Sequence, residues 1–167
     1  MKPLEPPDTH CLAAADGWLE LGVPAEAEAE LGRISAAQQA HPDVLEMRWL
    51  ILAHTQRWGA ALEIARTLVK RAPDRSSGWL HQAYALRRVP TAGLREARDS
   101  LLAAYDKFPG EPTISYNLSC YACQLRQLDE ARTWLRRALD SGSKQKILQM
   151  ALDDPDLEPL WDEIRKF

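Results

Sequence analysis

Cys120 and Cys123 stand in the stretch CYAC, the spacing of a redox dithiol or of half a zinc site. A reactive dithiol normally has its nucleophilic cysteine at a helix N-terminus, where the helix dipole lowers the thiol pKa. Pro112 is typical of a first helical turn, which places Cys120 about two turns inside the helix. A zinc site would need further ligands, and the four histidines form no zinc motif. A thiol-redox or metal-binding protein is therefore the less favoured hypothesis, and we expect no metal and no cofactor.

Other catalytic motifs are missing from the sequence. It contains no glycine-rich phosphate loop and no Gly-x-Ser-x-Gly nucleophile elbow. The odd count of three cysteines argues against a disulfide framework. A net charge of −3 argues against a nucleic-acid binder that relies on a broad basic field. The sequence predicts a protein that is not an enzyme and that does not bind nucleic acid.

The composition is typical of a helical chain. Glycine is scarce, at 8 residues, and alanine, leucine, arginine and glutamate dominate, all of them good helix formers. No apolar run reaches the roughly 18 residues that a membrane-spanning helix needs. The N-terminal stretch MKPLEPPDTHC lacks the apolar core of a secretion signal. We therefore expect a cytoplasmic protein without membrane insertion.

Four segments of the chain place an alanine in the same setting, with spacings of 34, 36 and 34 residues. Apolar or small residues recur four and seven positions after each alanine, which marks one face of a helix. A second apolar-periodic segment precedes each of these helices. The pattern predicts four helix–turn–helix units at about 8–41, 42–75, 76–111 and 112–145. The remainder, 146–167, breaks the period, and its stretch DDPDLEPLWDEI predicts a capped helix that covers the last unit.

This pattern resembles the tetratricopeptide repeat (TPR), a helix pair of 34 residues with a near-fixed alanine in its second helix. The segments WGAALEIARTLVKRAP and SYNLSCYACQLRQLDEARTWLRRAL carry the resemblance most clearly. It implies an all-α, right-handed α-solenoid of four units with a C-terminal capping helix, in one domain over residues 1–167, as in bacterial TPR arrays. Trp49 departs from the pattern, because it stands where the family usually has a small residue. Trp49 and Trp134 mark either interhelical packing or an exposed patch or dimer contact.

The resemblance also implies a concave groove, lined by the first helix of each unit, that holds a peptide or a partner helix. The register places these residues on its lining: Asp16, Glu46, Leu50, Tyr84, Arg87, Arg88, Tyr116, Asn117, Cys120 and Cys123. The arginine pair could bind an acidic group or a C-terminal carboxylate, since guanidinium groups match carboxylates in geometry. The alternative is that both arginines are simply solvated. The cysteine pair becomes a candidate part of the binding surface.

The sequence thus predicts a non-enzymatic scaffold for protein–protein interaction. A small chaperone or assembly factor of the same fold is the alternative, and self-association is compatible with both.

Overall fold

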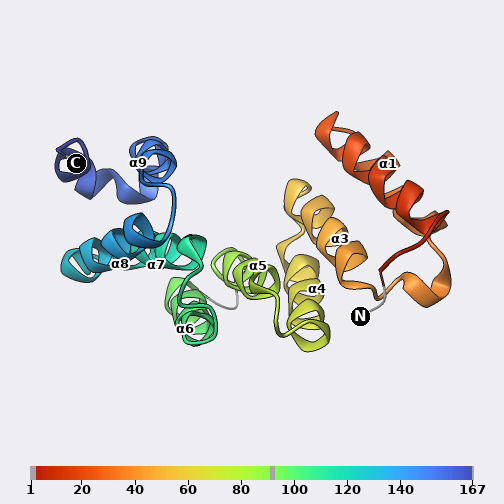
Figure 1. The fold of residues 1–167 in the computed structure, drawn as a ribbon, viewed down its shortest axis with the longest axis horizontal. Coiled ribbons are helices and arrows are strands. Elements are labelled where there is room, and N and C mark those ends of the chain that lie inside the picture. Colours follow the sequence, from red (N-terminus) through yellow and green to blue (C-terminus); the bar gives the residue numbers. More distant parts are fainter. Residues whose placement is uncertain (1–2, 91–92, 167) are drawn as a thin grey trace. The chain divides into compact units, whose positions relative to one another are not determined.

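The computed structural model describes residues 3–90 and 93–166, and over these ranges the chain forms helices and no β-strand (Figure 1). The predicted all-α class is therefore confirmed. Two compact units divide the chain, Met1–Ala85 and Leu86–Phe167, so the expectation of one domain stays a prediction. Within the described ranges, every helix is too short or too polar to traverse a bilayer.

The helices begin where the repeat pattern places them. The first unit contains Asp8–Glu20 (α1), Pro24–Arg33 (α2), the 3-10 helix Ala36–Gln38 (η1), Pro42–His54 (α3), Trp58–Arg71 (α4) and nearly all of Ser76–Leu86 (α5). The second contains Leu94–Tyr105 (α6), Pro112–Gln124 (α7), Leu128–Ser141 (α8), Lys144–Asp153 (α9), the 3-10 helix Pro155–Leu160 (η2) and Trp161–Ile164 (α10). Helices α1, α3, α5 and α7 start at residues 8, 42, 76 and 112, the first residues of the four expected repeats.

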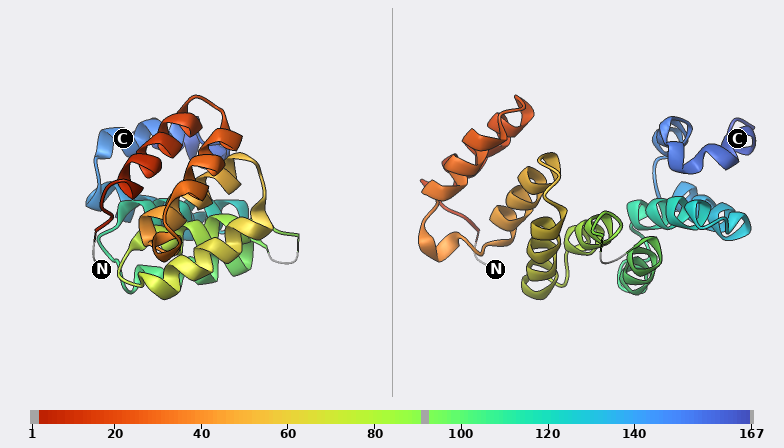
Figure 2. Two further views of the ribbon diagram at one scale, coloured as in Figure 1. Left: turned by 90° about the vertical axis from the view of Figure 1, so that its right-hand side faces the viewer. Right: turned by 180° about the vertical axis from the view of Figure 1, so that it is seen from behind.

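Three of the repeated alanines lie where the two helices of a pair meet. Helix α1 packs against α2, α3 against α4, and α7 against α8 (Figure 2). All four alanines are fully buried: Ala27, Ala61, Ala97 and Ala131. An alanine side chain ends at Cβ, so it lets the backbones approach closely. Because α7 and α8 lie this close together, the Ser119 Oγ can donate a hydrogen bond to the Ala131 carbonyl, at 2.8 Å.

In three of the helix pairs, the turn contains a residue with left-handed backbone conformation. Gly22, Gln56 and Arg126 have φ values of 74°, 56° and 64°. They stand at equivalent repeat positions, directly after the first helix of a pair, where such a residue ends a helix. Glycine adopts this conformation freely, whereas the other two residues do so at a cost of about 1 kcal/mol. The repeat geometry therefore outweighs local preference at two of these three turns.

The C-terminal part differs from the single capping helix that we expected. It forms α9, then η2, then the short α10. Asp154 caps η2, since its Oδ1 accepts a hydrogen bond from the Asp156 N–H at 2.9 Å. Pro159 lies inside η2 and has no N–H to donate, which disfavours a continuous α-helix there. Three apolar side chains of this part are nevertheless buried, those of Leu157, Leu160 and Ile164.

The two unusual tryptophans are buried, so the exposed-patch interpretation is wrong. Trp49 is 5% exposed and stacks on His81, with ring centroids 3.8 Å apart. Trp134 is 7% exposed and meets Tyr105 edge to face at 4.9 Å. Both indoles fill space between helices, as large aromatic side chains usually do.

Candidate functional site

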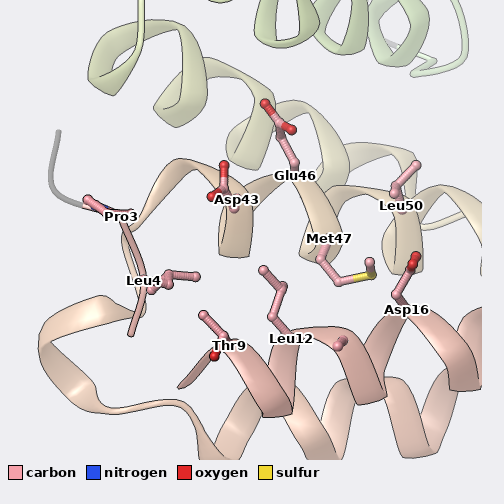
Figure 3. Close-up of a pocket in the computed structure, with 10 residues that line it drawn as sticks. Pro3, Leu4, Thr9, Leu12, Asp16, Asp43, Glu46, Met47 and Leu50 are labelled. Carbon is pink, nitrogen blue, oxygen red and sulfur yellow. The ribbon is translucent and has the colours of Figure 1, made fainter. Parts of the chain in front are cut away.

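An open cavity of about 500 Å³ lies between α1 and α3 in the first unit, and we call it the α1–α3 groove (Figure 3). The residues that line it are Pro3, Leu4, Thr9, Leu12, Ala13, Asp16, Asp43, Glu46, Met47 and Leu50. Three of these, Asp16, Glu46 and Leu50, are residues that the sequence placed on a groove lining. The structure therefore brings the N-terminal members of the predicted site together.

The floor of the groove is the edge of the hydrophobic core. Met47 belongs to the core cluster of this unit, and Leu4 and Leu12 pack against that cluster. The start of α1 is held by Asp8, whose carboxylate accepts hydrogen bonds from the N–H and the Oγ of Ser35, at 2.8 and 2.6 Å. This connection fixes α1 beside the segment that leads into α3. The shape of the groove thus depends on the packing of the core beneath it.

The rim of the groove is acidic. Asp43 and Glu46 both contact Arg75, at 2.5 and 3.4 Å, and Glu46 also accepts a hydrogen bond from the Ser77 hydroxyl at 2.6 Å. The hydrogen bond to Asp43 raises the pKa of the Arg75 guanidinium. Asp16 is exposed, and no cation among the described residues pairs with it. The groove therefore combines an apolar floor with negative charge that is only partly compensated.

The predicted residues Arg87, Tyr116 and Cys120 lie together in the second unit, but they do not line an open groove. Arg87 binds the carboxylate of Asp156 through both terminal nitrogens, with an Nη2–Oδ1 distance of 2.8 Å. The Tyr116 hydroxyl donates to Asp154 at 3.0 Å, and the Cys120 thiol donates to the same oxygen at 3.4 Å. The C-terminal segment thus covers the surface that we expected to be open.

The remaining predicted residues join neither cluster. Tyr84 belongs to an aromatic group with Trp49 and Trp58 in the first unit and is 38% exposed. Arg88 and Asn117 are half-buried. Cys123 is buried beside Cys120 on α7, at 1% exposure.

The environment of the cysteine pair opposes thiolate chemistry. Burial, together with the nearby Asp154 carboxylate, raises the pKa of Cys120, and burial also raises the pKa of Cys123. Nucleophilic cysteines need the opposite shift. Cys120, Asp154 and Asp156 are close enough to hold a metal ion, but Arg87 already neutralises one of the carboxylates. The arrangement gives no support to the redox and metal hypotheses.

Alkylation should distinguish the three thiols. Cys120 and Cys123 are buried, whereas Cys11 is partly exposed, so we expect iodoacetamide to modify Cys11 at least about 10-fold faster in the native protein. Mass spectrometry of quenched samples measures each site, and the three rates should converge in urea. Equal rates under native conditions would contradict the burial of the cysteine pair.

Sequence reasoning missed Asp154 and Asp156 as parts of this cluster. The sequence pattern predicted a capped helix over the stretch DDPDLEPLWDEI and indicated no contact for either carboxylate. Asp154 and Asp156 stand on either side of Pro155, a pattern that is typical of a turn and places two carboxylates in it. Nothing in the sequence indicated which surface that turn would contact.

Solved structures share this fold at low sequence identity. A thermophilic TPR protein from Thermus thermophilus has a TM-score of 0.69 at 18% identity, over 95% of this chain and 95% of that chain. YrrB, described as a TPR protein with an unusual peptide-binding site, has a TM-score of 0.67 at 17% identity, over 89% of this chain and 75% of its own. A double mutant of MamA RS-1 has a TM-score of 0.69 at 16% identity, over 98% and 94%. No family model and no curated protein matches the sequence.

The fold is therefore that of the TPR proteins, an all-α solenoid of helix pairs. The resemblance inferred from the repeat pattern is confirmed at the level of the fold.

Proposed function

We propose that this protein is a non-enzymatic scaffold that binds a peptide or a partner helix in the α1–α3 groove. The observation that carries the proposal is the groove itself, an apolar cavity of about 500 Å³ with a polar rim and a floor packed on the core. Binding to a surface that core packing holds in place reduces the entropic cost of ordering it. The description of YrrB as having a peptide-binding site agrees with this use of the fold. The same groove would also serve a small chaperone or assembly factor.

The chemistry of the groove favours a partner that is apolar and positively charged. Leu12, Met47 and the 40% exposed Leu50 offer apolar contact. Asp16 offers a carboxylate that no described cation neutralises, and the rim carries two further acids. An amphipathic segment with leucine-like anchors and a lysine or arginine complements both features.

This partner differs in charge from the acidic one that the arginine pair suggested. Arg87 is bound to Asp156, so it is not available to an acidic partner in this state. An acidic partner is therefore proposed only for the second unit, where the Asp156 carboxylate would first have to move away from Arg87.

Selection from a phage-displayed library of 16-residue peptides on the full-length protein tests the proposal. We expect enriched sequences to combine lysine or arginine with leucine, isoleucine, methionine or phenylalanine. The double substitution Asp16→Lys and Leu50→Lys should weaken a selected peptide at least about 10-fold, because it removes an apolar contact and reverses the local charge. Isothermal titration calorimetry measures the affinity.

The matched control is Glu63→Lys. Glu63 is an exposed acid on α4, a helix that contributes no residue to the groove. This variant should bind the peptide as the wild type does. If the groove variant keeps full affinity, or if Glu63→Lys loses it equally, the α1–α3 groove is not the binding site.

A further inference from the structure

The same helix face is open in one unit and filled in the other. Glu46 and Leu50 on α3 line the open α1–α3 groove. Tyr116 and Cys120 occupy the same positions relative to the start of α7, four and eight residues after its first proline. They are buried at 6% and 2% exposure, because η2, within the C-terminal segment Asp154–Ile164, lies against α7. We call this segment the tail segment.

The tail segment is held by contacts of the kind that recognise an acidic peptide. Donor groups of Arg87, Tyr116 and Cys120 all point to its two carboxylates, on Asp154 and Asp156. The Gln124 amide also donates to the Asp156 backbone carbonyl at 3.5 Å. Within this cluster the protein surface supplies donors and the tail segment supplies acceptors. Arg87 is further positioned by the Tyr121 ring, whose centroid lies 5.6 Å from its Cζ.

The tail segment is also organised internally. The Asp154 carboxylate accepts from the N–H of Asp156, and this turn presents both carboxylates to the same surface. Leu157 and Leu160 are buried beside them, so the segment combines two acids with two apolar anchors within seven residues. A short peptide with that pattern would satisfy the same donors and fill the same space.

We propose that the tail segment is an intramolecular ligand that blocks a second binding site on α7, and that this site takes an acidic partner peptide bearing two carboxylates two residues apart. The proposal rests on the proposed scaffold function but concerns a different surface with opposite charge. A partner binds by replacing the tail segment, contact for contact. Since a tethered segment has an effective concentration of about millimolar, only a strong or locally concentrated partner displaces it.

The first test is the exposure of Cys120, which the tail segment covers. In full-length protein, Asp156→Asn removes the charge that binds Arg87 and keeps the side-chain shape. We expect iodoacetamide to modify Cys120 roughly 10- to 100-fold faster than in the wild type, since a charge-assisted pair is lost. The control Asp162→Asn removes an exposed carboxylate that pairs only locally with Arg165. It should leave the rate unchanged.

The second test is binding of a fluorescein-labelled peptide with the sequence LDDPDLEPLWDEI, which is that of residues 152–164. We expect it to bind the Asp156→Asn protein at least about 10-fold more tightly than the wild type, in which the tethered segment competes. A peptide with asparagine at the positions of Asp154 and Asp156 should bind neither protein. Adding Arg87→Ala to the variant should abolish binding.

Several results would overturn the proposal. A folded Asp156→Asn protein with wild-type Cys120 reactivity, or one with exposed Cys120 that does not bind the peptide, would make the tail segment a fixed structural cap. A stable dimer of the variant would assign the site to the tail segment of a second copy. If the variant unfolds, amide hydrogen exchange of the wild-type protein provides the test. The amides of residues 156–164 should exchange faster than those of α7. Equal protection of the two segments would contradict release of the tail segment. Binding in the α1–α3 groove should be the same in all these variants, which separates this proposal from the first.

Discussion

Replacing Leu118 with alanine is expected to lower the free energy of unfolding by about 2–5 kcal/mol. Leu118 is fully buried on α7, the helix that packs against α6, α8 and η2. Truncation there removes apolar contacts from several elements and leaves a cavity that rigid helix pairs cannot close. The melting temperature should fall by roughly 5–15 °C. Urea and thermal unfolding followed by circular dichroism measure both quantities.

Leu21→Ala is the matched control, since Leu21 is 73% exposed. The same change there should alter the unfolding free energy by no more than about 0.5 kcal/mol. A loss below about 1 kcal/mol for Leu118→Ala would contradict the central position of α7 in its unit.

Acidification is expected to destabilise the first unit through His81. Burial against Trp49 lowers the pKa of His81 from 6.5 to about 4, although the nearby Glu46 acts in the opposite direction. The unfolded chain then binds the proton more tightly than the folded one. Stability contributed by neutral His81 is therefore complete above about pH 6.5 and is lost as the pH falls towards 4. The loss reaches at most about 3 kcal/mol, and less to the extent that solvent screens this partly exposed ring.

Thermal unfolding of the wild type and of His81→Phe between pH 7 and pH 4 measures this effect. Phenylalanine keeps an aromatic ring beside Trp49 but does not titrate, so the variant should lose less stability over this range. Asp8, whose pKa is lowered by its hydrogen bonds to Ser35, contributes in both proteins and cancels in the comparison. Parallel losses in the two proteins would show that His81 is not responsible.

The repeat architecture was predictable because it is encoded locally. Each buried alanine, such as Ala61 or Ala131, sits in a helix whose apolar period can be read within one segment. The prolines at 42 and 112 mark first helical turns, and α3 and α7 begin there. The same register predicted three of the ten residues that line the α1–α3 groove, Asp16, Glu46 and Leu50. The register did not predict that Leu4 lines the groove, because Leu4 belongs to the segment before the first repeat.

The second cluster shows the limit of this reasoning. Register placed Tyr116 and Cys120 on the same helix face as the groove residues of α3, and that placement agrees with the structure. The repeat register could not indicate that the tail segment would cover this face of α7. The covering segment follows the last repeat and has no periodic counterpart, and its carboxylates reach Arg87 across 69 residues of sequence.

By itself, the sequence determined the all-α class, the repeat period and the starts of the helices, because helical periodicity and close packing at alanine act over a few turns. Only the tertiary structure decided which parts of that face are open. It left a groove with an apolar floor and an acidic rim between α1 and α3. It placed Asp154 and Asp156 over α7, because the path of the chain after the last repeat depends on long-range contacts. Because of those contacts, we interpret the CYAC stretch as a surface beneath the tail segment and no longer as a site for chemistry.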